Sequence, residues 1–238
     1  MIPSPAGKLS YDGVVVVIPA LNEEASIGLV VSALPPVGAI LVVDNGSTDG
    51  TAEQARAAGA TVLMERRRGY GNACQAGIRE AFALKADVVV ILDADNADDP
   101  SLIGQLVDPI LLGELDFVLS DRTRSADTGA LLPHQRYGNR LATRLMKVST
   151  GHRYADMGPF RAIRAHALQA LDMQDPNYGW NVEMQMKAVQ HGLRIREVSM
   201  PYRQRIGQSK ISGTVQGTVK AGAKIIWSVG QFHKWNAR

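Results

Sequence analysis

The sequence is poor in cysteine and in aromatic residues, and it has no long apolar run. Cys74 is the only cysteine, so no disulfide can form within the chain, and the five histidines show no zinc-like spacing with it. The longest apolar runs, such as Val14–Ala20, fall well short of the roughly 18 residues that a membrane span needs, and the N-terminus lacks the apolar region of a signal peptide. We therefore expect a cytoplasmic protein without a zinc site.

The charge is unevenly distributed along the 238 residues. Of 26 basic and 23 acidic residues, nine basic residues but only one acid, Glu197, lie between His191 and Arg238. Such a basic end favours an anionic partner. Because no nucleic-acid-binding motif is found, we expect a phosphate-bearing ligand or a membrane surface, and no nucleic acid.

The first 120 residues alternate between short β-branched runs and helix-like stretches. Strands are predicted at 14–18, 39–43, 61–64, 87–92 and 116–120. Helices are predicted at 22–33, 48–58 and 72–85, and another would begin at Asp99 and Pro100 as cap and first residue. After a flexible tail over residues 1–12, this alternation predicts one α/β domain, whose mostly parallel sheet is covered by helices on both faces.

Residues 13–120 are expected to form a nucleotide-binding half and residues 121–213 an acceptor half. The acceptor half has a helix to about Thr150, a strand near Phe160, a helix over 180–190 and an apolar run over 193–198. Residues 214–238 are predicted to form a basic amphipathic helix. Its four Lys and Arg side chains, at about 1 kcal/mol each on an anionic surface, predict reversible membrane contact. Core packing or a homodimer contact is the alternative for its apolar stripe.

Acidic and polar residues follow three of the predicted strands. They lie in the segments Pro19–Glu24, Asp44–Gly50 and Asp93–Asp99. In an open parallel sheet, ligands bind beyond the carboxyl ends of the strands, where helix N-termini also point. We therefore expect the ligand site at this edge of the sheet.

Helix capping explains some of these residues, but not the strand-end acids. The candidate caps are Asn22, Ser47 or Thr48, and Asp99. Capping leaves Asp44, Asp93 and Asp95 unexplained. An Asp-x-Asp pair at a strand end offers the oxygen ligands that Mg²⁺ or Mn²⁺ prefers, and such an ion would bridge the pair to a diphosphate and stabilise its departure.

Motifs in this order and spacing are those of a known family. They are Ile18–Glu24, Val43–Thr51, Gly69–Ala73, Asp93–Asp95, Ser120–Arg122, Asp156–Arg161, Trp180–Glu183 and Arg203–Gly213. From Val14 to about Gly213 the chain resembles the family-2 inverting glycosyltransferases, in particular the dolichol-phosphate mannosyltransferase and polyprenyl-phosphate glycosyltransferase branch. The resemblance implies a GT-A fold and a metal-dependent, inverting transfer of a hexose from a UDP- or GDP-hexose.

The resemblance also implies roles for individual residues. Nucleotide-sugar contacts are implied for Pro19, Leu21, Glu23, Asp44, Asn45, Gly71, Asn72, Asp93, Ala94 and Asp95. Asp95, with Asp93, would bind Mg²⁺ or Mn²⁺ and so support catalysis. Related enzymes often carry Gln as a further metal ligand where this chain has Ala97, so Asn96, Asp98 or water would have to replace it. The chain also lacks the Gln-x-x-Arg-Trp signature of processive synthases, which favours single transfers.

The acceptor decides which further residues matter. An alcohol acceptor needs a carboxylate base, for which Asp156 is the first candidate and Glu183 the second. A polyprenyl phosphate is already largely dianionic at neutral pH and needs cations to position it more than it needs a base. The candidate cations are Arg122, Arg203, Arg205 and Lys210, and also Arg136, for which a surface salt bridge is favoured.

Three other functions are compatible with parts of the sequence. A soluble hydroxyl acceptor is an alternative to the lipid. A non-catalytic nucleotide-sugar-binding protein is a second alternative, which Ala97 favours. Sugar nucleotidyltransferases share the sheet and the paired acids, but they usually have a Gly-rich loop and Arg after the first strand, where this chain has Pro19–Glu24. That difference argues against them.

Overall fold

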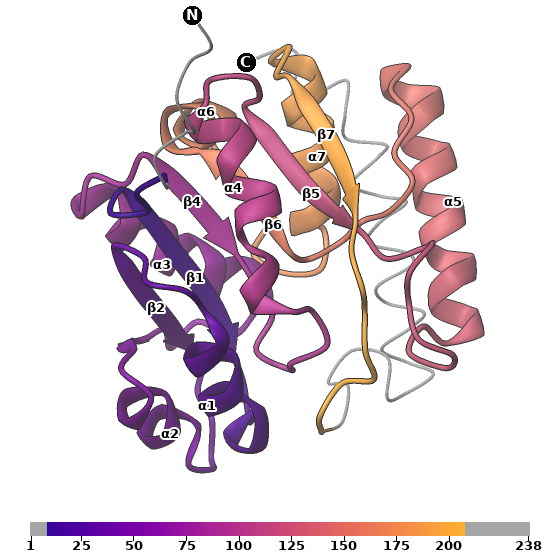
Figure 1. Ribbon diagram of the computed structural model, residues 1–238. Coiled ribbons are helices and arrows are strands. Elements are labelled where there is room, and N and C mark those ends of the chain that lie inside the picture. The colour runs from indigo at the N-terminus through magenta and orange to yellow at the C-terminus, as the bar shows by residue number, and fades with distance from the viewer. Residues whose placement is uncertain (1–8, 208–238) are drawn as a thin grey trace, which may run out of the picture.

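The computed structural model describes residues 9–207 (Figure 1). The strands are β1 (Val14–Ala20), β2 (Ala39–Asp44), β3 (Thr61–Met64), β4 (Val88–Ile91), β5 (Phe117–Asp121), β6 (Arg161–Arg164) and β7 (Ile195–Ser199). The helices are α1 (Glu24–Ala33), α2 (Thr51–Ala57), α3 (Tyr70–Ala83), α4 (Gly104–Leu111), α5 (Pro133–Thr150), α6 (Ala165–Leu171) and α7 (Trp180–Gln190), with a 3₁₀ turn, η1, at Pro100–Leu102.

These strands form a single sheet in the order β3-β2-β1-β4-β6-β5-β7. β1, β2, β3 and β4 are parallel to one another, as are β5 and β7, whereas β6 runs antiparallel to both of its neighbours. The chain moves outward from β1 to β2 and β3 and then returns to place β4 on the other side of β1. The strand order therefore reverses between β1 and β4, which is where an open α/β sheet leaves a crevice for a ligand.

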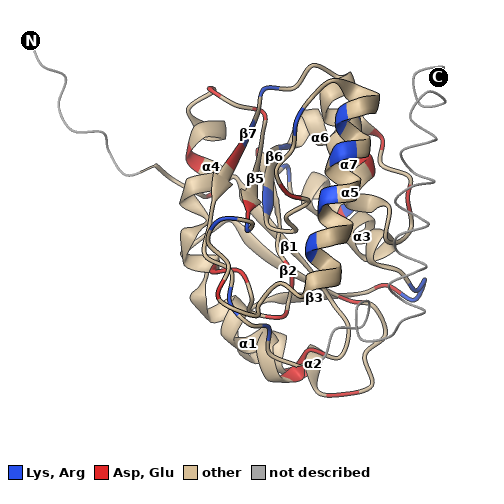
Figure 2. Cartoon of the chain, turned by 90° about the vertical axis from the view of Figure 1, so that its right-hand side faces the viewer, with Lys and Arg blue, Asp and Glu red and all other residues tan. Residues whose placement is uncertain are grey.

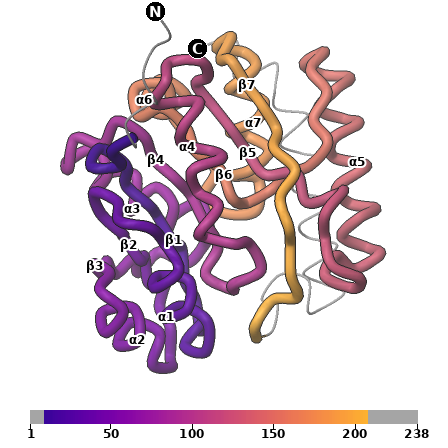
Figure 3. Tube along the Cα trace, viewed as in Figure 1, coloured from indigo at the N-terminus to yellow at the C-terminus, as the bar shows by residue number. Residues whose placement is uncertain are grey.

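Both faces of the sheet are covered because successive side chains of a strand point in opposite directions. In β1, Val15 and Val17 pack with residues of α3, α5, α6 and α7, whereas Val14, Val16 and Ile18 pack with residues of α1, α2 and α4. Each fully buried valine or isoleucine contributes about 1.5–3 kcal/mol. Figure 3 shows α5 at the opposite side of the molecule from β2 and β3.

The predicted α/β fold with a mostly parallel sheet and two covered faces is confirmed. Helix α6, a single short element directly after β6, was not predicted. Strands from both predicted halves, 13–120 and 121–213, lie in the same sheet. Lys210 and the predicted helix over 214–238 lie outside the described residues. Among residues 9–207, no helix combines the length and apolarity that crossing a bilayer requires.

The N-terminal segment that precedes β1 is described from Leu9 onward. Tyr11, within the predicted tail, is half-buried, and its hydroxyl donates a hydrogen bond to Asp108 Oδ1 at 2.6 Å. Its carbonyl oxygen accepts hydrogen bonds from the amides of Val14 and Gly38. The last residues before β1 are therefore tied to α4 and to the start of β2.

Candidate active site

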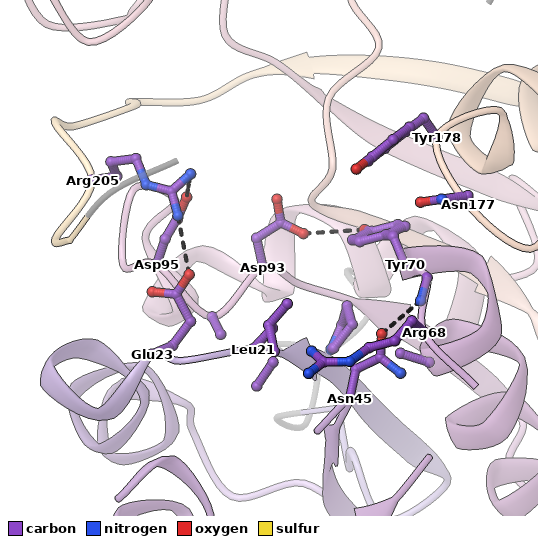
Figure 4. A pocket seen from close by; sticks show the side chains of 15 residues that line it. Leu21, Glu23, Asn45, Arg68, Tyr70, Asp93, Asp95, Asn177, Tyr178 and Arg205 are labelled. Carbon is purple, nitrogen blue, oxygen red and sulfur yellow. Dashed lines mark hydrogen bonds and ion pairs between the residues drawn. The ribbon is translucent and has the colours of Figure 1, made fainter. Parts of the chain in front are cut away.

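A cavity of about 290 Å³ lies where the strand order reverses, beyond the carboxyl ends of β1 and β4 (Figure 4). The residues predicted for this site that line it are Pro19, Leu21, Glu23, Asn45, Asp93, Ala94, Asp95 and Arg205. Those that do not line it are Asp44, Gly71, Asn72, Arg122, Asp156, Glu183 and Arg203. The lining also includes Arg68, Tyr70, Asn177 and Tyr178, to which sequence analysis gave no role.

The loops after β1 and β2 are joined by polar side chains. The Asn22 amide donates to Ser47 Oγ at 2.9 Å, and Asn22 Oδ1 accepts from the Thr48 amide at 2.8 Å. The residues that precede α1 and α2 are Glu23 and Gly50, and neither forms a side-chain capping bond. The predicted caps Asn22, Ser47 and Thr48 are therefore wrong, because these side chains bond across the two loops.

The predicted cap at Asp99 is confirmed, although it begins a 3₁₀ turn. Its carboxylate accepts from the Ser101 amide at 3.1 Å, and Pro100 occupies the first helical position. Asp99 also forms an ion pair with Arg203, whose side chain is about half exposed. This pair lies outside the cavity lining, so Arg203 fastens the chain after β7 to the loop after β4.

Asp44 and Asn45, at the end of β2, shape the cavity through the backbone. Asp44 is buried, and its Oδ1 accepts from the amides of Gly46 and Ser47 at 3.1 and 2.8 Å. Asn45 Nδ2 donates to the carbonyl oxygens of Glu65 and Arg67, and its Oδ1 accepts from the Gly69 amide at 2.8 Å. One buried amide side chain thus fixes both flanks of Arg68, which lines the cavity.

Gly71 and Asn72, in the first turn of α3, contact a loop that is distant in sequence. A Cβ atom at Gly71 would lie 2.0 Å from the carbonyl oxygen of Asp175, so only glycine permits this approach. The Asn72 amide donates to the carbonyl oxygen of Pro176 at 3.0 Å. These two residues hold the loop that brings Asn177 and Tyr178 to the cavity.

The Asp93–Ala94–Asp95 segment places its two carboxylates in the cavity wall. Tyr70 donates its hydroxyl to Asp93 Oδ1 at 3.1 Å. Burial, together with the negative charge of Asp95, raises the pKa of Asp93 to about 6. Asp95 Oδ1 accepts from the Ala97 amide at 3.0 Å, which turns the loop back on itself and leaves Oδ2 toward the cavity. The paired acids are therefore short of positive charge.

Arg205 supplies part of that charge. Its guanidinium lies between the loops after β1 and β4, with Nη2 at 3.1 Å from Glu23 Oε1 and Nη1 at 3.3 Å from Asp95 Oδ2 (Figure 4). The chain that carries it is fixed by two backbone bonds, from the Arg203 amide to Ala97 and from the Ile206 amide to Asp95. Arg205 thereby joins three separate segments at the cavity.

Asp98 lies buried next to this group, with 2% of its surface exposed. Neither of its carboxylate oxygens has a hydrogen-bond partner among residues 9–207. Burial raises the pKa of Asp98 well above its usual range, against the lowering effect of Arg122. Asn96, Asp98 and water were the candidates to replace the metal ligand that is missing at Ala97. Asp98 is one of them, and within the described part of the chain it is a buried carboxylate without a hydrogen-bond partner beside the Asp93–Asp95 pair.

Asp156 and Arg122, both in the predicted acceptor half, form a buried ion pair outside the cavity lining. Arg122 Nε and Nη2 donate to the two carboxylate oxygens of Asp156 at 2.7 and 2.9 Å, and the amides of Arg122 and Met157 donate to them as well. Burial alone would raise the pKa of Asp156, but the charge and hydrogen bonds of Arg122 outweigh it and lower the pKa. The Arg122 guanidinium also lies 5.0 Å from the ring centre of Tyr202.

Glu183, the second candidate base, is held in the first turn of α7. Its carboxylate forms an ion pair with Lys187 at 2.7 Å and accepts from the amides of Gln174 and Asp175 at 2.9 and 2.6 Å. These bonds fix the chain just before the loop that carries Asn177 and Tyr178. Like Asp156, Glu183 is 1% exposed and away from the cavity lining, and its role as a base stays a prediction.

Comparison with known proteins identifies the family. The model of a family described as "Glycosyl transferase family 2" matches residues 15–172. The chain belongs to glycosyl transferase family 2. Relatives of this glycosyltransferase include an uncharacterized glycosyltransferase of Mycobacterium tuberculosis, which is 38% identical over 224 residues, or 90% of this chain and 96% of the relative.

Two named relatives act on lipid phosphates according to their names. The dolichyl-phosphate hexose transferase of Haloferax volcanii is 33% identical over 85% of this glycosyltransferase and 88% of its own length. The undecaprenyl-phosphate mannosyltransferase of Micrococcus luteus is 30% identical, with coverages of 86% and 89%. The predicted membership in the polyprenyl-phosphate branch of the family is thereby supported.

A solved structure of similar fold is glucosyl-3-phosphoglycerate synthase from Mycobacterium tuberculosis, in complex with Mn²⁺, UDP and glucosyl-3-phosphoglycerate. It superimposes with a TM-score of 0.73 at 26% identity and covers 92% of this glycosyltransferase and 79% of the synthase. The predicted GT-A fold is confirmed by this likeness together with the sheet described above.

The cavity of this glycosyltransferase fits a divalent cation held jointly with a diphosphate. Among residues 9–207, no three His, Cys, Asp or Glu side chains are grouped to hold a metal ion by themselves. Mg²⁺ in phosphate-transfer sites is usually bound by one or two carboxylates, with substrate phosphates and water completing its shell. Asp93 and Asp95 provide such a pair in the wall of the cavity, and Asp98 is a buried carboxylate next to them whose two oxygens have no hydrogen-bond partner among the described residues.

Proposed function

We propose that this glycosyltransferase transfers a hexose, with inversion, from UDP- or GDP-hexose to a polyprenyl phosphate. The observation that carries the proposal is the Asp93–Asp95 pair in a cavity at the point of strand reversal, with Arg205 beside it. The two named lipid-phosphate relatives support the acceptor class. The absence of a processive signature supports a single transfer.

The residues around the cavity divide by position between the parts of the donor. Pro19, Leu21 and Asn45 come from the ends of β1 and β2 and would contact the nucleoside. Asn177 and Tyr178 approach from the acceptor half and would contact the hexose. Asp93 and Asp95 would hold Mg²⁺ or Mn²⁺, which when bound neutralises charge on the leaving diphosphate.

The acceptor phosphate would meet cations that lie near the Asp93–Asp95 segment. A phosphate dianion is already a nucleophile, so its transfer depends on cations that orient it rather than on a base. Arg205 lines the cavity, and Arg122, which does not line it, is close enough to lower the pKa of Asp93. In this scheme Asp156 acts as a positioning residue, because its carboxylate fixes the side chain and backbone of Arg122.

A soluble acceptor that carries a phosphate is the second candidate. It is favoured by the structural likeness to glucosyl-3-phosphoglycerate synthase, whose complexes include one with Mn²⁺, UDP-glucose and phosphoglyceric acid. Such an acceptor presents a hydroxyl group as well as a phosphate. Asp156 or Glu183 would then have to gain access to the cavity to act as a base.

Nucleotide release tests both candidates in one assay. The full chain is incubated with each UDP- and GDP-hexose and Mn²⁺ or Mg²⁺, alone, with a short polyprenyl phosphate, or with phosphoglyceric acid, beside Asp95→Asn. Release that rises with the lipid and is lost in Asp95→Asn is the expected result. Release that rises only with phosphoglyceric acid favours the soluble acceptor. Donor binding without release under any condition would leave only the nucleotide-sugar-binding alternative.

A further inference from the structure

Helix α5 is 18 residues long but only lightly attached to the rest of the protein. Its buried residues are Ala142, Thr143 and Met146, which form a narrow strip on one side. On the other side, large apolar side chains are exposed: Tyr137 is 71% exposed, Val148 is 86% exposed, and Leu141 is 37% exposed. Exposed apolar groups that gather on one helix face indicate an interaction surface.

The same helix carries a row of positive charge. Its four cations are Arg136, Arg140, Arg144 and Lys147, and the helix contains no Asp or Glu. Among residues 9–207, none of these four forms an ion pair with another described side chain, and blue segments recur along α5 in Figure 2.

The apolar and basic residues form adjoining stripes. Tyr137, Leu141 and Val148 are spaced by four and seven residues, which places them on one side of a helix. The cations at 136, 140 and 147 have the same spacing one residue earlier, and so lie beside the apolar stripe. An apolar stripe next to a basic stripe is the pattern of a helix that lies in the interface plane of a membrane.

We propose that α5 is a docking helix for a membrane surface containing anionic lipid headgroups. Charge decides between this partner and two others. A second copy of α5 would bring like charges together. Residues 208–238 of the same chain contain five Lys and Arg and no Asp or Glu, so they offer α5 no opposite charge. Anionic headgroups complement the cations, and the acyl boundary accommodates the apolar side chains.

The attachment of α5 relates this surface to the acceptor side of the site. Asn139 Nδ2 donates to the Ala155 carbonyl oxygen at 3.2 Å, and its Oδ1 accepts from the Met157 amide at 3.0 Å. These bonds flank Asp156, the partner of Arg122. A membrane under α5 would therefore lie next to the loop that holds Arg122. The docking surface is additional to the proposed transfer, because it requires no particular acceptor.

Vesicle flotation of the full chain tests the docking surface separately from the reaction. The vesicles are phosphatidylcholine alone or phosphatidylcholine with phosphatidylglycerol, both free of polyprenyl phosphate. We expect binding only to the anionic vesicles, with a decrease at high salt. Arg140→Glu/Arg144→Glu should weaken it at least about 25-fold, at about five-fold per cation removed. Tyr137→Ser/Val148→Ser should weaken it without changing the charge.

Two double variants serve as controls of equal charge change. Arg56→Glu/Lys85→Glu alters exposed cations away from α5 and should leave binding near the wild-type level. Lys220→Glu/Lys224→Glu reports on the C-terminal segment. Loss of binding in the α5 variants with retention in the first control supports the proposal. It is overturned if the wild-type chain does not float, if only the C-terminal variant loses binding, or if the α5 variants instead dissociate an oligomer in sedimentation velocity.

Discussion

Replacement of Asp156 by asparagine distinguishes a positioning residue from a catalytic base. The substitution keeps the shape of the side chain but removes the charge that faces Arg122. In the structure, the Asp156 carboxylate is 1% exposed and accepts four hydrogen bonds, three of them from Arg122. Asparagine would instead present an NH₂ group to one of the guanidinium donors and leave the Arg122 cation without its counter-ion.

The expected loss of stability is large because the Arg122 side chain is itself only 15% exposed. Removing one partner of a buried ion pair costs about 3–5 kcal/mol, since the remaining charge stays buried without compensation. The free energy of unfolding of a domain is about 5–15 kcal/mol in total. Asp156→Asn should therefore still fold, but it should unfold at a clearly lower denaturant concentration. Glu53→Gln, at an exposed pair 4.0 Å apart, is the matched control and should change stability by less than about 0.5 kcal/mol.

Urea unfolding of the wild type, Asp156→Asn, Arg122→Met and the double variant measures the pair directly. The double variant should be more stable than the sum of the single losses predicts, by about 1–3 kcal/mol, because the two changes remove one shared interaction. In activity assays, a positioning role predicts residual transfer with a raised acceptor KM. If Asp156→Asn keeps its stability within 1 kcal/mol or so and loses kcat alone, the reasoning is refuted and Asp156 acts as the base.

Three further substitutions test the loops around the cavity. Asp98→Asn should stabilise the metal-free protein, because burial raises the pKa of Asp98 in the folded state and its ionisation therefore opposes folding. The gain in unfolding free energy should grow as the pH rises above about 4, by at most about 1.4 kcal/mol per pH unit. Urea unfolding at several pH values measures it, and a difference between variant and wild type that does not change with pH would contradict the prediction. Gly71→Ala places a Cβ 2.0 Å from the Asp175 carbonyl oxygen and should cost about 1–3 kcal/mol and weaken nucleotide-sugar binding in calorimetry; unchanged binding would disprove the link to that loop. Arg205→Gln removes a cation 3.3 Å from Asp95 and should tighten Mn²⁺ binding in the absence of nucleotide roughly ten-fold, as measured by electron paramagnetic resonance. An affinity for Mn²⁺ equal to or weaker than that of the wild type would show that Arg205 does not compete with the metal ion for Asp95.

The sheet and the acidic wall of the cavity could be predicted because both depend on local patterns. Residues that follow parallel strands, such as Leu21 and Asp93, lie at the same edge of the sheet, so the strand pattern alone predicts where they are. Their neighbours follow the same rule. The family resemblance then separated the Asp-x-Asp pair from ordinary helix caps.

Residues whose position depends on distant contacts could not be predicted in this way. Arg68 lines the cavity because Asn45, more than twenty residues earlier, binds the backbone on both sides of it. Asn177 and Tyr178 are there because α3 offers a glycine at the one place where the 175–176 backbone must approach. In the sequence, the only signals were Gly71 and the amide side chain of Asn45. Both were interpreted as contacts to the nucleotide sugar, whereas in the structure they position loops of the protein.

Asp156 illustrates another case, in which Asp156 and Arg122 were both singled out as site residues but their pairing was not predicted. A carboxylate in a family motif is equally compatible with a base and with an ion pair, and 34 residues separate it from Arg122. Only the fold brings β5 and β6 together so that the two side chains meet. The physical distinction between the two roles is therefore burial and pairing, which sequence spacing does not contain.

The charges of the cavity make cation and donor binding depend on each other. Among the described lining residues, Glu23, Asp93 and Asp95 are acidic, whereas Arg68 and Arg205 are basic. A diphosphate entering alone would add negative charge beside Asp93, whose pKa is already raised by burial and by the negative charge of Asp95. A divalent cation entering alone would be repelled by Arg205, which already forms ion pairs with Glu23 and Asp95. When both enter, the positive charge of the cation and the negative charge of the diphosphate would compensate each other, so each ligand would relieve the repulsion that the other meets.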